Sequence, residues 1–450
     1  MDAIEGGAIV LLLIALYAGA VWALRRSGRI GKDRALSFFG PALMLKTRRG
    51  QSFLDRLGRY RRFWSVAGDI GIALAISAMA LIVGLLVLGA FYVRQVPASA
   101  APSPQEALGL PGINPIIPLG YGLVALIVGV VLHELCHGVV ARSQGIGVKS
   151  IGILWLVIPV GAFVEQDDAD MQAAPRRRRD RVAAAGVLAN FGLTVVFFVL
   201  LAALLSTSVT PVADGLGISS VVSGMPASNA SLAAGDVLTS LNGTMTPNVG
   251  ALEDALSTTH PGENVTITYY STSLDRSVTS TLTLTSLTAL DGVKADRNRS
   301  ALGVVLTPLT PAQLRTELVS PVSASGGPLI GVTTWIILPL ATLEPVSSQT
   351  AVFFHLSGPM ASLGSGGFWI VANLLYWLAW MNLLLGLSNA LPLVPLDGGL
   401  LFRDFMATLG ARLRRGWNAS QLEQFASRAA IASSLIIVLL LVWQFVGPQL

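Results

Sequence analysis

Six long apolar runs divide the chain, and each is free or nearly free of charged residues. They cover residues 6–24, 70–93, a stretch ending at Leu132, 182–205, 367–396 and 429–446. A helix needs about 20 apolar residues to cross a bilayer, so this pattern predicts a polytopic α-helical membrane protein with about six transmembrane helices. Only 12% of the residues are charged, against about 25% in soluble domains. The composition therefore excludes an ordinary soluble enzyme and also a disordered chain.

Charges beside these runs predict the orientation of the chain. Residues 25–66 contain twelve Arg and Lys but two Asp, which places this segment in the cytoplasm by the positive-inside rule. The Arg residues follow the first run rather than precede it, so we expect an uncleaved span with an extracytoplasmic N-terminus. A nucleic-acid patch is the alternative interpretation of residues 25–66. Because two spans frame the segment, we expect no nucleic-acid partner.

Two segments between spans are predicted to form strands. Residues 148–165 are rich in β-branched and apolar side chains with Gly and Pro breaks, which predicts a membrane-associated β-hairpin. The nearby acidic residues Glu165, Asp167 and Asp168 are interpreted as solvated charges at the membrane edge. Residues 207–320 are rich in Ser and Thr, contain short strand-like runs, and carry nine acidic against five basic residues. They follow an inside-to-outside span, so we expect an extracytoplasmic, strand-rich module.

Residues 328–343 are apolar and could form a further span. If they crossed, the Arg residues at 403–415 would lie outside the cell, so we expect this run to dip into or lie along the membrane. The predicted regions are 1–118 with two spans and a basic cytoplasmic loop, 119–206 with two spans and the hairpin, 207–320 as the module, 321–366 as a membrane-associated connector, and 367–450 with two spans and a cytoplasmic loop.

The third apolar run continues into His133-Glu134-Leu135-Cys136-His137. On a helix, residues four apart share one face, so His133 and His137 can bind one metal ion, and Glu134 can reach a water molecule on it. In a chain of this composition, the expected number of such patterns by chance is on the order of 10⁻³. Charged and polar groups near the end of a span are costly unless they have partners, which favours a functional site. Cys136 is interpreted as a buried, inert thiol.

A zinc hydrolase usually supplies three protein ligands, so one more is needed. His260 and His355 are poor candidates, because both are expected on the outer side of the membrane. Asp397 follows a long charge-free run and is expected on the same side as His133. Pro392 and Pro395 should break the helix before it, and Gly398 and Gly399 permit a tight backbone there. A helix-terminal or turn residue at the membrane surface is the alternative interpretation of Asp397.

These motifs resemble those of the site-2 protease family of intramembrane zinc metalloproteases. His133-Glu134-x-x-His137 is similar to the zinc helix of that family, Ala185–Asn190 to its Ala-Gly-Pro-x-x-Asn segment, and Asn389-x-x-Pro392 through Gly398 to its third-ligand motif. Val187 stands where the family often has Pro. The resemblance implies that Asp397 is the third ligand of one Zn²⁺ per chain. It also makes Asn190 and Asn389 candidates for substrate binding.

The module resembles a PDZ domain, and such insertions are familiar in this family. The resemblance rests on Gly224-Met-Pro226-Ala227-Ser228, on Leu232 through Leu238, and on Leu241-Asn242-Gly243. It implies an α+β fold. Gly215-Leu216-Gly217-Ile218 is then expected to be a loop that binds a peptide carboxylate through backbone N–H groups. A turn without a ligand is the alternative interpretation of that loop.

The resemblance implies an intramembrane protease that cleaves membrane proteins within or near their transmembrane segments, in regulated intramembrane proteolysis. Glu134 would take a proton from water and return it to the leaving amine. The expected substrates are single-span proteins that have already been trimmed, held in the lipid bilayer of the cell membrane, with the active site near the cytoplasmic face. A membrane metal transporter or a metal-binding scaffold without hydrolysis is the alternative, and a catalytically silent PDZ receptor is a third class.

Overall fold

The computed structural model describes residues 16–24, 26–27, 36–39, 42–97, 103, 105–106, 109–155, 159–289, 299–323, 327–342 and 351–450. Residues 16–24 are helical, and the rest of the first predicted span lies outside the described residues. The chain divides into two compact units. Unit 1 comprises Met1–Pro115, Leu119–Val196 and Leu378–Leu450, and unit 2 comprises Ile116–Pro118 and Phe197–Trp377.

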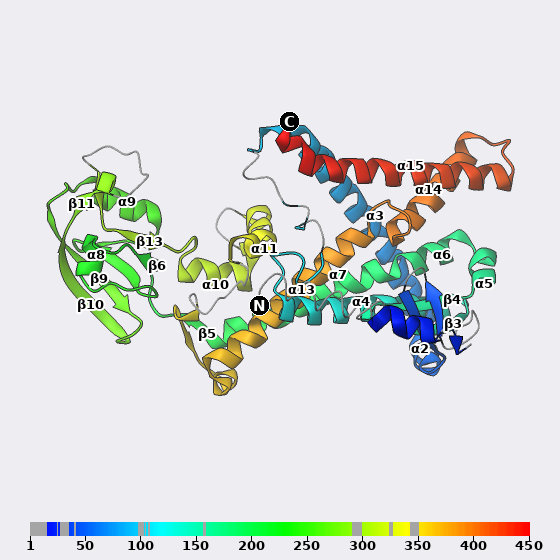
Figure 1. Cartoon of the computed structure of the whole chain (residues 1–450), viewed down its shortest axis with the longest axis horizontal. Helices are drawn as coiled ribbons and strands as arrows, with labels where there is room; N and C mark the ends of the chain where they lie inside the picture. Colours follow the sequence, from blue (N-terminus) through cyan, green and yellow to red (C-terminus); the bar gives the residue numbers. More distant parts are fainter. Residues whose placement is uncertain are drawn as a thin grey trace. The chain divides into compact units, whose positions relative to one another are not determined.

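Helices dominate unit 1, and the longest of them are apolar (Figure 1). They are α2 Gln51–Gly58, α3 Arg61–Tyr92, α4 Leu119–Ser143, α5 Asp168–Ala173, α6 Arg176–Ala183, α7 Ala185–Ser208, α13 Gly364–Asn389, α14 Asp397–Leu413 and α15 Ala419–Val446, of which α7 and α13 continue into unit 2. Within the described residues, five helical segments are long and apolar enough to cross a membrane: Arg61–Gln95, Leu119–Ser143, Arg176–Ser208, Pro359–Asn389 and Ala419–Gln449. They coincide with five of the six predicted spans.

The fifth predicted span is shorter than its apolar run. Helix α13 ends at Asn389, whereas the run continues to residue 396. Pro392 and Pro395 lie in the non-helical segment that follows, as the sequence predicted, because proline lacks the N–H that a helix interior requires. The chain becomes helical again at Asp397, the first residue of α14.

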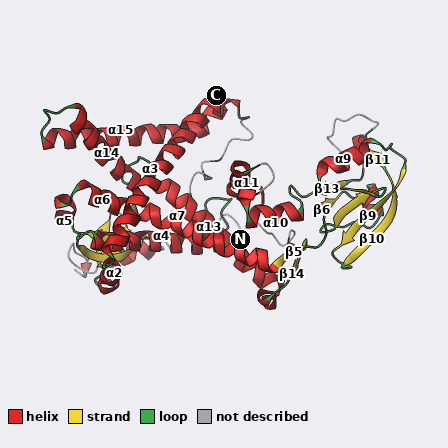
Figure 2. Cartoon of the chain, turned by 180° about the vertical axis from the view of Figure 1, so that it is seen from behind, coloured by secondary structure: helices red, strands yellow, loops and turns green. Residues whose placement is uncertain are grey.

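A four-stranded antiparallel sheet in unit 1 contains the predicted hairpin. Its strands are β1 Leu36–Phe39, β2 Ala42–Thr47, β3 Val148–Trp155 and β4 Pro159–Gln166, in that order. Strands β3 and β4 pair with Ile151 opposite Val164, so the predicted strand pair is confirmed. Figure 2 shows the sheet beside α2. Strands β1 and β2 lie inside the basic segment 25–66 and were not predicted.

Ion pairs fix the short basic helix α6 within unit 1. Arg181 and Arg177 both donate to the Asp69 carboxylate of α3, at distances of 2.8 and 2.9 Å. Arg179 donates to Asp404 of α14 at 2.9 Å. Asp404 is buried, and a buried carboxylate requires such a partner. Helix α6 is thereby held to α3 and α14.

Unit 2 contains the inserted module, defined here as residues 207–320. Its main sheet has the order β10-β9-β7-β6-β13, with β8 paired to β7. The strands of unit 2 are β5 Val209–Pro211, β6 Leu216–Val221, β7 Val237–Leu241, β8 Thr244–Met245, β9 Asn264–Ser271, β10 Arg276–Thr283, β11 Thr285–Ser286, β12 Ser300–Ala301, β13 Val304–Leu306 and β14 Phe354–Leu356. Its remaining helices are α8 Pro226–Asn229, α9 Val249–Ser257, α10 Pro311–Val319 and α11 Pro328–Thr342.

Side chains that alternate along these strands form the core of the module. In β9, Val265, Ile267 and Tyr269 are buried, whereas Asn264 and Thr266 are exposed. This period of two is expected when one face of a sheet packs inward. Helix α11 covers most of the run 328–343 and has 15 residues, a length of about 22 Å that is shorter than the roughly 30 Å hydrocarbon core of a bilayer.

Candidate metal centre

Helix α4 carries two histidines on one face. His133 and His137 are both 7% exposed, and their Nε2 atoms lie 3.2 Å apart. This proximity follows from their spacing of four residues, which places side chains one helical turn apart. The prediction that the two imidazoles share a face is confirmed.

Asp397 joins this pair from a distant part of the sequence. Its Oδ2 atom lies 3.4 Å from His133 Nε2 and 3.2 Å from His137 Nε2. Each of the three residues offers one possible ligand atom, and these atoms all lie within 4.8 Å of one another. Asp397 Oδ2 is buried and has no hydrogen bond of good geometry among the described residues. Two imidazole nitrogens and one carboxylate oxygen form a donor set that suits zinc.

Glycine residues leave the room that this arrangement needs. A Cβ at Gly186 of α7 would lie 2.2 Å from His133 Cε1 and 2.5 Å from His137 Nε2. A Cβ at Gly398 would lie 2.2 Å from the Ala390 carbonyl oxygen. The space at Gly186 adjoins the Nε2 atoms that would bind a metal. At Gly398, the absence of a side chain lets the backbone approach the Ala390 carbonyl closely, and this turn places Asp397 beside the histidines. The residues present therefore fit a zinc ion.

The second nitrogen of each imidazole is also engaged. His137 Nδ1 lies 2.7 Å from the Val182 carbonyl oxygen of α6. His133 Nδ1 lies 3.0 Å from Nδ2 of Asn190 in α7, and Asn190 is fully buried. The sequence predicted that Asn190 contacts substrate. In the structure its side chain contacts the His133 ring, and the expected contact with substrate stays a prediction.

Glu134 connects α4 to the hairpin. Its Oε2 atom accepts a hydrogen bond from the Val164 N–H of β4 at 3.1 Å. Strand β4 is the last strand of its sheet in the described part of the chain, and its Val164 N–H is used by Glu134 rather than by another strand. The carboxylate follows His133 in the sequence and contacts β4 in space.

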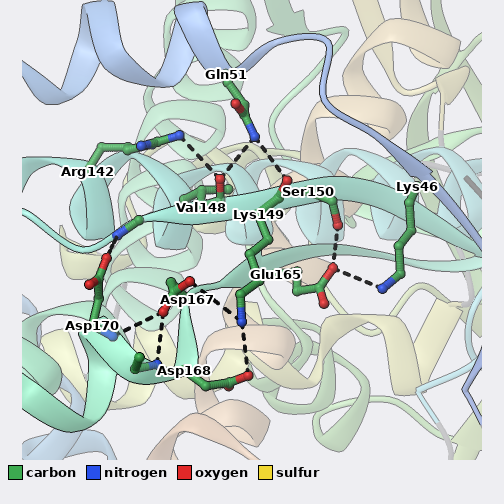
Figure 3. Close-up of polar contacts among 12 residues, drawn as sticks. Lys46, Gln51, Arg142, Val148, Lys149, Ser150, Glu165, Asp167, Asp168 and Asp170 are labelled. Atoms are coloured by element: carbon green, nitrogen blue, oxygen red, sulfur yellow. Dashed lines mark hydrogen bonds and ion pairs between the residues drawn. The ribbon is translucent and has the colours of Figure 1, made fainter. Parts of the chain in front are cut away.

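Polar contacts hold the hairpin in register, and Figure 3 shows them. Glu165 Oε2 accepts from the Ser150 hydroxyl at 2.5 Å and from Lys46 Nζ of β2 at 3.0 Å. Burial alone would raise the pKa of Glu165, but these two donors lower it below its ordinary value. Asp167 accepts from two backbone N–H groups at the start of α5, and these hydrogen bonds lower its pKa. Glu165 and Asp167 are therefore partly exposed charges that also have defined hydrogen-bond donors.

Asp168 stays at the surface, with a side chain that is 88% exposed and pairs with Lys149. Asn389 donates to the Leu385 carbonyl of its own helix at 3.0 Å, and no recorded contact of this side chain reaches the three metal-group residues. His260 and His355 belong to unit 2 and are not part of the group. Cys136 is partly buried.

The predicted carboxylate-binding loop is a strand. Residues 216–221 form β6, which pairs with β7 on one side and β13 on the other. The Ile218 N–H already donates to the Asp236 carbonyl at 2.8 Å, and Leu216 and Ile218 are buried in the module core. The expectation of a loop is therefore wrong for residues 216–218, and peptide binding at Gly215–Ile218 stays a prediction. The run that forms β6 is short, so its sequence alone fits either a loop or a strand. Its pairing with β13 cannot be inferred from the neighbouring residues, because β13 lies far away in the sequence.

Sequence reasoning assigned no role to Gly186, Val182 or Val164. Gly186 lay within the recognised Ala185–Asn190 segment, and that segment was the one signal that could have pointed to it. Val182 and Val164 make their contacts through backbone atoms, so the type of residue at these positions does not predict the contacts.

Comparisons with known proteins agree with the motifs. The model of peptidase family M50 matches residues 121–437. An uncharacterized protein of Methanocaldococcus jannaschii is 27% identical over 98% of this chain and 97% of its own length. A Mycobacterium tuberculosis protein named as a zinc metalloprotease, Rip3, is 38% identical over 18% of this chain and 19% of its own. A protein of Arabidopsis thaliana, named as a homolog of the membrane-bound transcription factor site-2 protease, is 29% identical over 42% and 37%.

One solved structure is similar to a part of the chain. The PDZ domain of the SdrC-like protein of Listeria monocytogenes is 23% identical, with coverage of 21% of this chain and 90% of that domain. The TM-score is 0.18. A value this low does not establish a shared fold.

Proposed function

Because the chain belongs to peptidase family M50, the site-2 protease family, we propose that it is an intramembrane zinc metalloprotease. It would hydrolyse peptide bonds within or near transmembrane segments of other membrane proteins. The family match covers most of the chain, and the apolar helices make it a multi-pass membrane protein. The observation that carries the proposal is the convergence of His133, His137 and Asp397, with Glu134 next to His133 on the same helix.

His133, His137 and Asp397 would hold one zinc ion through Nε2, Nε2 and a carboxylate oxygen. When bound, zinc supplies Lewis-acid chemistry, which polarises a peptide carbonyl and acidifies water. Glu134 is placed to accept a proton from water as general base and to return it to the leaving amine as general acid. Its hydrogen bond from the Val164 N–H keeps the carboxylate on the side of α4 that faces β4.

A substrate helix must unwind before it can be cleaved, because its peptide groups are hydrogen-bonded and covered by side chains. Strand β4 has a strand partner on one side only in the described part of the chain, so an extended segment could add to its other edge. That side carries the Val164 N–H next to Glu134. We therefore propose that substrate lies along β4, with the scissile peptide close to Glu134. Asn389 remains a candidate for contact with this segment.

The proposed orientation places residues 25–66 and 403–415 in the cytoplasm and the inserted module outside. Single cysteines at Ser52 and Ser420, which are exposed positions, should then be shielded from an impermeant thiol reagent in intact cells. A cysteine at the exposed Ser277 of the module should react. The measurement uses a Cys136→Ala background. Labelling at Ser420 but not at Ser52 would show that α11 crosses the membrane.

The decisive experiment compares the native chain with Glu134→Gln, Asp397→Ala and Asp168→Ala in purified protein and in cells. Glu134→Gln should keep zinc and lose at least about 100-fold in cleavage, because an amide accepts no proton. Asp397→Ala should lose zinc, whereas Asp168→Ala, a surface acidic residue, should keep both zinc and activity. Zinc is measured by metal analysis. Cleavage is measured on a single-span reporter and by membrane proteomics for accumulated single-span proteins. Full cleavage by Glu134→Gln would remove Glu134 as the general base. A native chain that binds zinc but cleaves no substrate would favour a metal transporter or scaffold.

A further inference from the structure

The two imidazoles of the metal group are supported by different partners. His137 Nδ1 faces a backbone carbonyl, Val182 O, at 2.7 Å. His133 Nδ1 faces the side-chain amide of Asn190 at 3.0 Å. A carbonyl can only accept, so His137 must carry its hydrogen on Nδ1 and leaves Nε2 as a lone pair. An amide can either donate or accept, so Asn190 leaves the tautomer of His133 open.

A metal ion at this group requires one particular tautomer of His133. A ligating imidazole uses the Nε2 lone pair, and its hydrogen is then on Nδ1 and needs an acceptor. With the amide nitrogen of Asn190 toward Nδ1, His133 would instead carry its hydrogen on Nε2 and donate it to His137 Nε2, 3.2 Å away. Rotation of the amide by half a turn brings Oδ1 to Nδ1 and frees Nε2. The amide orientation is set by the hydrogen-bond network in which it takes part.

The surroundings of Asn190 support a specific role for this oxygen. Asn190 is fully buried, and its Oδ1 atom has no hydrogen-bond partner among the described residues. A buried amide oxygen without a donor destabilises the folded chain, because the hydrogen bond that it made with water is not replaced. The Nδ1–H of His133 is a donor within reach, since the two groups are already 3.0 Å apart. Rotating the amide would satisfy this oxygen and would place His133 in the ligating tautomer.

We propose that Asn190 is a positioning residue for His133, whose Oδ1 accepts the Nδ1–H and holds the ring in the tautomer that leaves Nε2 free for metal. This inference rests on the proposed zinc site but assigns Asn190 a partner other than substrate. Asn190 acts through His133 and touches no reacting atom. The role requires an acceptor at this position, not an amide as such.

Three variants of the full chain test this assignment. Asn190→Leu keeps the approximate size of the side chain but removes the acceptor, and Asn190→Asp keeps an acceptor and cannot donate when ionised. The matched control is Asn382→Leu. Asn382 is also fully buried, also has an unpartnered Oδ1, and donates to its own helix at Leu378 rather than to a histidine. Each protein is titrated with zinc against a competing chelator, and cobalt-loaded samples are examined by visible spectroscopy.

Asn190→Leu should bind zinc about 10- to 100-fold more weakly, the usual effect of removing such a partner from a ligating histidine. Asn190→Asp should bind within about threefold of the native chain or more tightly, and Asn382→Leu should not change the affinity. Nitrogen NMR of the histidine rings in the zinc-loaded native chain should show the hydrogen of His133 on Nδ1. At saturating zinc, the KM of Asn190→Leu should equal that of the native chain.

Three results would overturn the inference. They are unchanged zinc affinity in Asn190→Leu, equal losses in Asn190→Leu and Asn190→Asp, and a raised KM with unchanged zinc affinity, the last of which would make Asn190 a substrate contact. If the native chain itself binds no zinc, the proposed function fails. That outcome is distinguishable from a failure of the Asn190 inference, because it is measured on the native chain before any Asn190 variant is compared.

Discussion

The metal group of unit 1 and the sheet of the inserted module are organised in opposite ways. In the module, Val265, Ile267 and Tyr269 alternate with exposed residues along β9 and fill the interior. Around His133 and His137, the neighbouring helix contributes Gly186, where even a methyl group would collide with both rings. The module is specified by the side chains that are present. The metal group also depends on a side chain that is absent.

This difference determines which kind of substitution each region tolerates. A core of apolar side chains is sensitive to removal of atoms, since a cavity is left behind. A site built around open space is sensitive to addition of atoms, since tightly packed neighbours cannot move away without strain. Matched substitutions in the two regions test whether these sensitivities are indeed opposite and independent.

The largest expected effect is the removal of atoms from the module core. Ile267→Ala should destabilise the module by about 2–5 kcal/mol, because Ile267 is fully buried. Limited proteolysis and hydrogen exchange of the full chain should show faster opening within residues 209–310. Thr266→Ala, on the exposed face of the same strand, is the control. Zinc content should remain unchanged, and a loss of zinc in Ile267→Ala would contradict the independence of the two regions.

The addition of one methyl group tests the metal region. Gly186→Ala should weaken zinc binding by about 1–3 kcal/mol, or roughly 5- to 150-fold, because the new Cβ would meet the His133 ring at 2.2 Å. Gly192→Ala is the control, since a Cβ at this position of the same helix meets no atom within 4 Å. Chelator competition measures both. Equal affinities in the two variants would show that the space at Gly186 is not needed.

A smaller effect is expected when the module is replaced as a whole. A Gly/Ser linker in place of residues 213–309 retains Thr310, whose hydroxyl accepts from the Gln313 N–H at the start of α10. Zinc content and cleavage of a short single-span substrate should stay within about threefold of native. Cleavage of substrates with large ectodomains should rise if the module restricts access, and cleavage of trimmed substrates should fall if it docks them. A folded, zinc-loaded variant without any activity would show that the module supports catalysis directly.

The smallest effect concerns the ion pair of the hairpin. Glu165→Gln should cost less than about 1 kcal/mol, because Glu165 is partly exposed. Its pKa is lowered in the folded chain, so its contribution to stability is present above the ordinary carboxyl pKa and is lost as the pH falls through the folded value. The difference in thermal unfolding between native and variant should therefore be present at pH 7 and vanish in acid. A double variant with Lys46→Met should add little to either single change.

Local sequence predicted the elements that carry their own signal. Apolar runs located five helical segments of the described chain, the β-branched run located β3 and β4, and the spacing of His133 and His137 placed two imidazoles together. The assignment of Asp397 as the third ligand came from the family resemblance. Its turn could be inferred from Pro392 and Pro395, but its distance from the histidines could not.

The features that were missed depend on partners far away in the sequence. Strands β1 and β2 are short and lie in a basic segment, and they become strands because β3 offers a partner about 100 residues later. Strand β6 was taken for a loop because its partner β13 follows some 85 residues further on. Residue type alone also does not reveal that the His133 ring lies 3.0 Å from Asn190, whereas the substrate contact expected of Asn190 stays a prediction.

The ligand set is divided between two stretches of unit 1 that are separated in the sequence by Phe197–Trp377 of unit 2. His133 and His137 belong to Leu119–Val196, and Asp397 belongs to Leu378–Leu450. A chain cut within the inserted module would therefore yield two membrane fragments, of which the first has two ligands and the second has one. Neither fragment alone could bind zinc as the intact chain is proposed to do. Recovery of zinc affinity on co-expression would then report the reassembly of two half-proteins inside a bilayer, without any need for a known substrate.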